Sequence, residues 1–478
     1  MIRKARSGQQ LVAGLAVALL GLVPQFAQAQ LNEQEIREIG TEAYLYFYPL
    51  VHGDLARRQA TNVDTVDKPG FFPANTFQHA ACFQDVPLKD GERPNLDALP
   101  SSAWLNVSRE PIIVSVPQSA DRYYFLSFFN HWSEIFLSLG SRTLGGRPGH
   151  FALVPAGWKG ALPKDVERID SPSMHVRVAA YTQAKGEKDC AAANAVQAGY
   201  RITPLSLWNK QPPKPGKFKP DPAIDMTTPV ADQIAAMPVA DYFRVALDTI
   251  KFKALNLTDS TMLMRMKKIG IDPTVRFDFQ KLDAGVRVAL LEVPSIATRQ
   301  IQWQRNVPVQ AGRGWVMPAV TQGVYGNAYL KRAGATAGDN AATPFVEAIY
   351  LTASLDTEGL ALKGDKKYTM RFKKGELPPA SAYWSLTMHD ETGKVISNSI
   401  NRTNINAETP LKLETDGSAI VHIQSFSPGA AWEGNWLPAP KGAFALVLRI
   451  FGPQPEALEG VWTPPSVERV KSGFSFSD

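Results

Sequence analysis

Apolar residues recur at spacings of three and four in several segments, which is the pattern of amphipathic helices. The first such segment follows Asn32, and Glu35 three residues later completes a capping box. We expect this helix to run through residues 36–48 and to end at Pro49, because proline interrupts the interior of a helix. The same spacing predicts further helices over residues 239–252, 260–269 and 284–302.

Two other regions carry short runs of β-branched and aromatic residues divided by turn residues, which is typical of antiparallel strands. In the first region, residues 111–181, the runs are 112–116, 123–126 and 174–180. The second region begins near residue 346 and contains the runs 383–389, 394–400, 419–426 and 444–451, with turns at 390–393 and 416–417. Strands at this spacing indicate a sandwich or jelly roll. The sequence therefore predicts an α+β fold with two antiparallel β-sandwich or jelly-roll-like domains joined by a helical segment.

Prolines concentrate in residues 211–222, a stretch that can neither pair as a strand nor wind as a helix. We interpret it as a linker or a wrapping loop. The predicted organisation is an N-terminal β-rich domain over residues 30–210, a proline-rich linker and helical segment over 211–340, and a C-terminal β domain over 341–478.

The first 29 residues have the pattern of a secretory signal peptide. Arg3, Lys4 and Arg6 form a basic start, residues 11–23 are apolar, and the small residues of 27–29 suit signal peptidase. The apolar run is shorter than the roughly 20 residues that a membrane span needs. We therefore expect cleavage at about Ala29 and a periplasmic or secreted protein; an uncleaved anchor is the alternative.

Composition and charge exclude several classes of partner. With 44% apolar and 20% charged residues, the chain of 478 residues is ordinary globular material. The net charge of +6 falls to +3 without the signal peptide, since 51 basic residues become 48 against 45 acidic ones. Because these charges are interspersed, we expect no nucleic-acid partner and, after signal cleavage, no membrane partner.

The chain contains two cysteines, Cys82 and Cys190. Export would place them where disulfides persist. A bond between them would close a loop of about a hundred residues, worth up to about 4 to 5 kcal/mol. Two buried free thiols are the alternative, because the sequence does not show whether the two residues are close.

Two sets of short motifs carry a resemblance to known families. The first set is Tyr46-x-Tyr48-Pro49, Asn75 to His79, Pro94-Asn95-x-Asp97, Ala103-Trp104, Arg122-Tyr123-Tyr124 and Gly140-x-Arg142-Thr143. The second set is Tyr383-Trp384-Ser385-Leu386-Thr387, Asp416-Gly417-Ser418, Asn435-Trp436-Leu437-Pro438-Ala439-Pro440 and Trp462-x-Pro464-Pro465. In these motifs the chain resembles the domain of unknown function DUF1254 followed by DUF1214. The resemblance implies two β-rich domains, frequent bacterial export and no activity established across the family.

The chain departs from the family pattern at its most polar stretch. Relatives usually show Pro-Asn-x-Asp-Thr-x-Tyr-Ser, whereas residues 94–101 here read Pro-Asn-Leu-Asp-Ala-Leu-Pro-Ser. A hydroxyl and a phenol are therefore missing, and Asn130 stands where relatives usually have an aspartate. If those groups do chemistry in relatives, this chain binds without catalysing or acts on another substrate.

The strongest candidate for chemistry is a polar constellation in the N-terminal domain. Asp97 or His79 would act as the catalytic base, while Asn95 and Arg142 would position a ligand. The alternative is structural: Asn95 and Asp97 would form an Asx-turn with Arg142 as its partner. Trp104 is a further candidate ligand contact.

One other feature carries a weaker signal. His131 and Glu134 would share one face of a helix, a spacing that suits two metal ligands or an acid–base pair. A surface pair with Trp132 and Phe136 packing inward is the alternative, and no further ligands complete a metal motif. Nor do we find a glycine-rich or lysine loop for a nucleotide, so we expect no metal and no cofactor.

We carry three functional hypotheses from the sequence. The first is an exported protein that binds a small organic or carbohydrate ligand in a polar cleft of the N-terminal domain, with or without hydrolysis or elimination. The second is a non-catalytic carbohydrate-binding protein that uses C-terminal aromatic residues, Trp436 foremost. The third is a structural β protein that assembles as a homo-oligomer.

Overall fold

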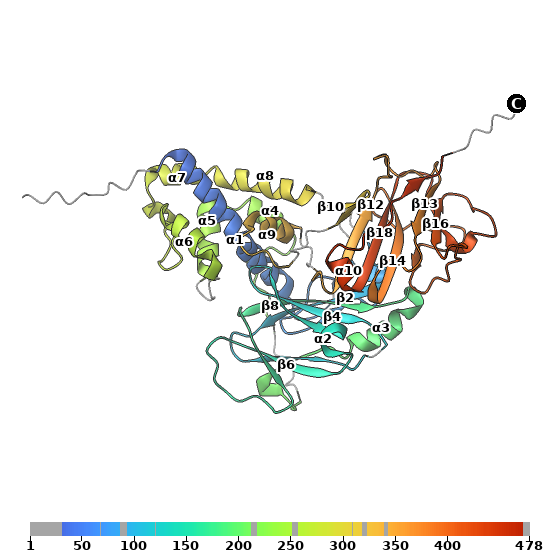
Figure 1. The fold of residues 1–478 in the computed structure, drawn as a ribbon. Helices are drawn as coiled ribbons and strands as arrows, with labels where there is room; N and C mark the ends of the chain where they lie inside the picture. The colour runs from blue at the N-terminus through green and yellow to red at the C-terminus, as the bar shows by residue number, and fades with distance from the viewer. Residues whose placement is uncertain are drawn as a thin grey trace, which may run out of the picture.

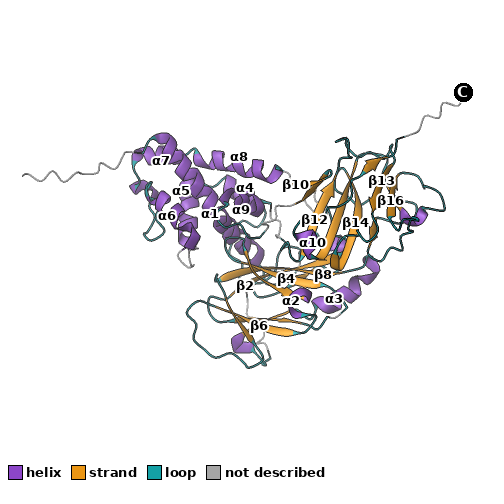
Figure 2. Cartoon of the chain, viewed as in Figure 1, coloured by secondary structure: helices purple, strands orange, loops and turns teal. Residues whose placement is uncertain are grey.

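The computed structural model describes residues 31–66, 68–86, 93–119, 121–211, 218–250, 257–307, 309–317, 323–338 and 343–471. The predicted signal peptide and part of the proline-rich segment lie outside these residues. Figure 1 shows three bodies: a group of helices, a β domain from the first half of the chain, and a β domain from the last third. Figure 2 shows that most helices gather in the first body, while the strands make up the other two together with the short helices α2, α3 and α10.

The first body, which we call the helical lobe, is built around α1 (Glu33–Thr61). Its other helices come from the middle of the chain: α4 (Val230–Ala235), α5 (Val239–Ile250), α6 (Ser260–Lys267), α7 (Ala284–Leu290), α8 (Val293–Asn306) and α9 (Tyr329–Ala337). A single apolar core, running from Ile36 to Ala337, joins α1 to these later helices. Thus α1 packs with helices about 200 residues further on, and not with the strands that follow it directly.

Helix α1 confirms the predicted start but not the predicted end. The Asn32 side chain accepts a hydrogen bond from the Glu35 backbone N–H, and the Glu35 carboxylate accepts one from the Asn32 N–H, both at 2.9 Å. The expected end at Pro49 is wrong, because the helix continues to Thr61. A proline inside a helix costs about 3 kcal/mol. Phe47 and Leu50 on either side are fully buried, and burial of each side chain is worth about 1.5 to 3 kcal/mol, which offsets that cost.

The predicted helix over 284–302 is two helices, α7 and α8. The break falls at Leu291 and Glu292, and Pro294 follows in the first turn of α8. Proline fits the first turn of a helix, but it has no N–H to donate to the carbonyl of Leu290 four residues earlier, so α7 does not continue through it. Helices α5 and α6 lie where the sequence predicts them, within two residues.

The N-terminal β domain is a sandwich of two sheets. Its strands are β1 (Gln78–His79), β2 (Ala98–Asn106), β3 (Ile112–Val116), β4 (Tyr124–Phe129), β5 (Ile135–Gly140), β6 (Gly149–Val154), β7 (Glu167–Asp170), β8 (His175–Gln183) and β9 (Arg201–Pro204). One sheet has the order β1-β2-β8-β4-β5 and the other β7-β6-β3-β9. Only the β6–β7 pair of these sheets is parallel. The core between the sheets includes Leu105, Leu126 and Val178.

The two cysteines form a disulfide in this domain. Cys82 and Cys190 are bonded, with their Cα atoms 5.4 Å apart and a sequence separation of 108. Cys190 begins α3 (Cys190–Gln197), and Cys82 precedes a short 3-10 turn. The bond ties the loop before β2 to the helix after β8, and it resolves the choice that the sequence left open.

The C-terminal β domain is a second sandwich. Its strands are β10 (Val309–Gly312), β11 (Trp315–Met317), β12 (Ala348–Ala353), β13 (Tyr368–Phe372), β14 (Ala380–Asp390), β15 (Asn404–Asn406), β16 (Ala419–Gln424), β17 (Trp436–Pro438), β18 (Phe444–Pro453) and β19 (Glu468–Arg469). The sheets have the orders β10-β11-β12-β18-β14-β15 and β17-β16-β13-β19. The turn predicted after His389 is present, but the strand predicted over 394–400 is wrong: residues 404–406 pair with β14 instead.

These elements confirm the α+β class with two β-rich domains. The helices do more than join the two sandwiches, because they enclose α1 and form a body of their own. Among the described residues, none of the helices combines the length and the apolar character needed to cross a membrane.

The N-terminal β domain is inserted between two parts of the helical lobe. The chain leaves the lobe after α1 and returns to it near Asp221. At that point the Asn62 side chain donates to the Asp221 carbonyl at 3.0 Å and accepts from the Asp221 N–H at 2.8 Å. The exit and the return are thus held side by side by one buried asparagine.

Candidate functional site

A cavity of about 360 Å³ lies at the junction of the helical lobe and the N-terminal β domain. The β domain contributes residues of β2, β4 and β8 and the turn after β4. The helical lobe contributes the second half of α1, the start of α4, and residues in and before α9. The cavity therefore exists only because the inserted β domain packs back against the lobe.

The β-domain wall of the cavity is a row of three side chains on neighbouring strands. Arg177 of the middle strand β8 pairs in register with Trp104 of β2 on one side and with Phe129 of β4 on the other. Directly opposed residues of antiparallel strands have Cβ atoms about 5 Å apart and project from the same face. The Arg177 guanidinium carbon lies 5.8 Å from the Phe129 ring centre. The guanidinium thus lies near the Phe129 ring, and Trp104 occupies the opposed position on the other neighbouring strand.

The turn after β4 adds polar groups to the cavity. The Asn130 side chain accepts the backbone N–H of Trp132 at 2.8 Å and that of Glu134 at 3.1 Å, which fixes the turn. Ser133 adopts a φ of 58°, a conformation that non-glycine residues adopt rarely. His131 and Ser133 line the cavity, while Trp132 packs on Tyr46 inside the helical lobe.

This turn overturns one expectation from the sequence. Residues 131–134 are not helical, so His131 and Glu134 do not share a helix face. His131 lies at the cavity, whereas Glu134 faces the buried guanidinium of Arg332, 3.4 Å away. The inward packing expected for Trp132 is confirmed.

The helical wall brings His52 and Tyr325 to the same space. His52 is buried and lies on α1, one turn beyond Tyr48. Burial raises the pKa of the Tyr325 phenol, so this group is neutral and can donate a hydrogen bond at physiological pH. The ring of His131 lies edge-on to that of His175, with centres 5.5 Å apart.

The charge of the cavity is one-sided. Among the described residues that line it, none is Asp or Glu, and Arg177 carries a full positive charge. Two imidazoles, two side-chain amides, three hydroxyls and a phenol add uncharged polar groups to the lining. Such a set suits an anion, because an arginine fork binds a carboxylate with two parallel hydrogen bonds.

Asp97 lies elsewhere, in the interface between the two β domains. Its carboxylate accepts a hydrogen bond from Ser385 of β14 and lies 3.8 Å from the Arg449 guanidinium of β18. Tyr383 donates to the Asp97 carbonyl at 2.9 Å. Burial raises the pKa of the Asp97 carboxyl, and Arg449 and Ser385 oppose that rise. Every described partner of this carboxylate belongs to the C-terminal domain.

Asn95 and Arg142 have structural partners in the same interface. The Asn95 side chain accepts the Asp97 N–H at 3.0 Å, which is the Asx-turn named as the alternative. Arg142, in the short helix α2 (Ser141–Leu144), donates to Glu347 at 2.9 and 3.0 Å and not to Asp97. Glu347 is fully buried and also accepts from Tyr123 at 2.7 Å.

His79 and Trp436 lie apart from both places. A ring nitrogen of His79 is 2.8 Å from the Ser101 hydroxyl, and burial lowers the pKa of this imidazole. Trp436 is buried, and its indole N–H donates to the Gln424 carbonyl at 2.8 Å. Of the residues predicted to bind ligand or to catalyse, Trp104 lines the cavity between lobe and β domain, as does His131 from the weaker His131–Glu134 signal.

Sequence reasoning missed His52, Arg177 and Tyr325. For Arg177 a signal exists: His175 and Arg177 interrupt an otherwise apolar β run at alternate positions, which places both on one face. His52 and Tyr325 are 273 positions apart in the numbering, and no local pattern could have joined them. No group of three or more His, Cys, Asp or Glu residues within the described ranges is arranged to hold a metal ion.

Comparison with known proteins identifies the two β domains. The family model described as "Protein of unknown function (DUF1254)" matches residues 74–204, and the one described as "Protein of unknown function (DUF1214)" matches residues 347–455. No curated protein matches the chain.

Two solved structures resemble this one. The VPA0106 protein from Vibrio parahaemolyticus is 23% identical, with a TM-score of 0.67 over 91% of this chain and 100% of its own. An uncharacterized protein from Burkholderia cenocepacia is 11% identical, with a TM-score of 0.41 over 92% of this chain and 95% of its own. The VPA0106 protein therefore shares this fold over the whole length of its chain.

Proposed function

We propose a function from the cavity itself, because the chain carries a DUF1254 domain and a DUF1214 domain, both described as protein of unknown function. The protein binds a small organic anion with a flat apolar part in the cavity between the helical lobe and the N-terminal β domain. The observation that carries this proposal is the row of Trp104, Arg177 and Phe129.

Each part of that row recognises a different part of the ligand. The Arg177 guanidinium would pair with a carboxylate of the ligand. The rings of Trp104 and Phe129 provide apolar area and prefer stacked or edge-on partners, so a flat ring beside the carboxylate fits them. The volume of about 360 Å³ lies within the range of small-molecule sites.

The cavity also bears on the hydrolysis or elimination considered from the sequence. Asp97 and His79, the bases named there, have partners outside the cavity. A reaction in the cavity would instead use His52 or His131 to accept a proton, because imidazole is the commonest general base. Binding without reaction is the simpler proposal, and it requires only the geometry described above.

The test is calorimetric titration of the purified protein with benzoate, benzyl alcohol and glucose. We expect benzoate to bind and benzyl alcohol, which has the ring without the charge, to bind at least tenfold more weakly. Arg177→Gln should weaken benzoate binding about tenfold or more, because a hydrogen bond to a charged group is worth about 1.5 to 3 kcal/mol.

The matched control is Arg168→Gln, which removes an exposed arginine of the same domain that pairs with Asp170. Arg168→Gln should leave the benzoate affinity unchanged. Equal affinities for benzoate and benzyl alcohol, or unchanged benzoate binding by folded Arg177→Gln, would contradict an anion site at Arg177. Tighter binding of glucose than of benzoate would favour a carbohydrate instead.

We also propose that the mature protein works outside the cytoplasm, as the signal-like start of the chain predicts. The Cys82–Cys190 disulfide supports this, because such bonds persist in oxidising compartments. Expression of the full chain in a Gram-negative host, followed by fractionation and N-terminal sequencing, tests the proposal. A periplasmic product beginning near residue 30 is expected, and a cytoplasmic product that keeps residue 1 contradicts it.

A further inference from the structure

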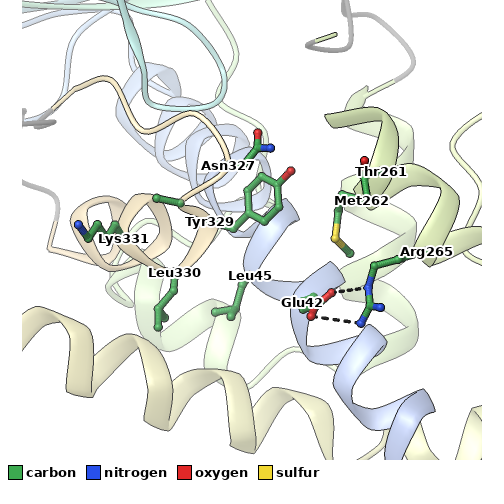
Figure 3. Close-up of a pocket in the computed structure, with 10 residues that line it drawn as sticks. Glu42, Leu45, Thr261, Met262, Arg265, Asn327, Tyr329, Leu330 and Lys331 are labelled. Atoms are coloured by element: carbon green, nitrogen blue, oxygen red, sulfur yellow. Dashed lines mark hydrogen bonds and ion pairs between the residues drawn. The ribbon is translucent and has the colours of Figure 1, made fainter. Parts of the chain in front are cut away.

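The helical lobe contains a second cavity, separate from the first in its lining. It has a volume of about 470 Å³ and lies between α1, α6 and the first turn of α9. Figure 3 shows its side chains around one hollow, with Leu45 and Glu42 on α1 opposite Thr261, Met262 and Arg265 on α6. It shares none of its lining residues with the first cavity.

The inner part of this cavity is apolar and flexible. Leu45 and Met262 belong to the buried core of the lobe, and Leu330 packs against that core from α9. Methionine and leucine present aliphatic surface, and the unbranched methionine side chain adapts to the shape of its neighbour. A short alkyl chain matches such a lining better than a rigid sugar, which would leave its hydroxyls unpaired.

The rim of the cavity is polar and carries one extra positive charge. Arg265 binds Glu42 through two hydrogen bonds of 2.8 and 3.2 Å, so these two charges balance. Lys331 also lies in the lining, and Glu42 is the only acidic residue among the described lining residues. The balance of one negative and two positive groups favours an anion at the mouth.

We propose that this second cavity binds a short-chain amphiphile that carries a carboxylate. The alkyl chain lies between Leu45, Met262 and Leu330, and the carboxylate lies at the rim on the side of Lys331, which Figure 3 shows across the hollow from Arg265. The site is independent of the first cavity, because none of its lining residues comes from a β domain.

The experiment compares three probes of equal chain length: octanoate, octan-1-ol and octyltrimethylammonium, each titrated into the whole protein. Octanoate should bind most tightly and octyltrimethylammonium least tightly. Lys331→Gln should weaken octanoate binding about threefold, as expected for an exposed charge pair, and leave octan-1-ol unchanged. Equal affinities for the three probes would overturn the proposal.

Two variants fill the space from opposite walls. Leu330→Trp fills it from α9, and Thr261→Trp fills it from an exposed position on α6. Either variant, if it keeps the wild-type circular dichroism, should weaken octanoate binding at least tenfold. Unchanged octanoate binding in a folded variant would contradict the site.

Arg177→Gln separates this proposal from the proposed function. It should lower benzoate affinity and leave octanoate affinity unchanged, because Arg177 lines only the first cavity. Loss of octanoate binding in Arg177→Gln would place that probe in the first cavity and overturn the second site, whatever the result with benzoate.

Discussion

At the scale of single residues, His389 offers the clearest link between burial and pH. It lies fully buried on β14, where its Nδ1–H donates to the Gly393 carbonyl at 3.0 Å. Burial, with the nearby Arg449 guanidinium adding to it, lowers the pKa of His389 to about 3. An unfolded chain would protonate the same imidazole near pH 6.5.

The sign of the effect follows from proton binding. Below pH 6.5 the His389 imidazole binds a proton in the unfolded state but stays neutral in the folded state, so acid favours unfolding. Lowering the pH from 7.5 to 5 should therefore reduce the free energy of unfolding by about 2 kcal/mol through His389 alone. Urea unfolding at both values, for the wild type and for His389→Gln, measures this.

The variant is the necessary comparison, because other groups titrate in the same range. Asp97, whose pKa is raised by burial, works in the opposite direction and gains stability in acid. We expect the wild type to lose about 2 kcal/mol more than His389→Gln over this interval. Parallel pH profiles for the two proteins would mean that His389 titrates alike in both states.

At the scale of elements, the disulfide fixes two segments that carry little regular structure. The 3-10 turn after Cys82 and the helix α3 flank strands β2 and β8, which pair along their whole length. Removing a cross-link of this span costs about 4 kcal/mol in the chain-entropy account. The double variant Cys82→Ser with Cys190→Ser should lose about that much stability.

The measurement is thermal unfolding of the double variant beside the wild type, with and without dithiothreitol. The reductant should destabilise the wild type and leave the variant unchanged. A reductant effect on the variant would mean that dithiothreitol acts on something besides this bond, and equal stability of the two proteins would contradict the predicted cost.

Elements with a strong local signal could be predicted, and those decided by distant contacts could not. The cap at Asn32 and the strand over residues 112–116 follow from their own residues. The passage of α1 through Pro49 depends on burial by helices about 200 residues away. The turn at residues 131–134 depends on the Asn130 side chain, which accepts a hydrogen bond from the Trp132 N–H. The helix-like spacing of His131 and Glu134 gives no sign of this bond.

The same division holds for the candidate site. A motif marks Trp104, which lines the cavity, and Asn95 forms the Asx-turn that the sequence offers as the alternative. The predicted grouping of Asp97 with Arg142 could not be judged from the sequence. Each residue takes a partner from the C-terminal domain, Ser385 in one case and Glu347 in the other, and these partners lie more than 200 positions further on.

At the scale of the whole molecule, buried polar bonds hold the two β domains against each other. Glu347 of the C-terminal domain accepts hydrogen bonds from Tyr123, Ser138 and Arg142 of the N-terminal domain. Glu347 is fully buried, whereas Arg142 remains partly exposed to water. Loss of a hydrogen-bonded buried charge leaves its partners unpaired, which usually costs more than the bond is worth.

Glu347→Gln should therefore lower the free energy of unfolding by about 2 kcal/mol. Differential scanning calorimetry should show a lower melting temperature and, because the domains are less tightly coupled, a broader or divided transition. Glu408→Gln is the matched control, since it breaks the exposed Lys185–Glu408 pair across the same two domains and should cost less than about 1 kcal/mol. Equal losses in the two variants would contradict a special role for the buried contact.

The bonds between Asn62 and Asp221 have a consequence for how the chain can be cut and rejoined. The N-terminal β domain leaves and re-enters its host at a single point, so a few residues could bridge the gap if the whole domain were removed. A gene that encodes such a shortened chain would keep the helices of the lobe but would remove Trp132, which belongs to the core of the lobe. The first cavity would lose one wall, whereas the second would keep all of its lining residues. The buried Glu347 would lose its partners in the removed domain, so the inserted domain also stabilises the chain that carries it.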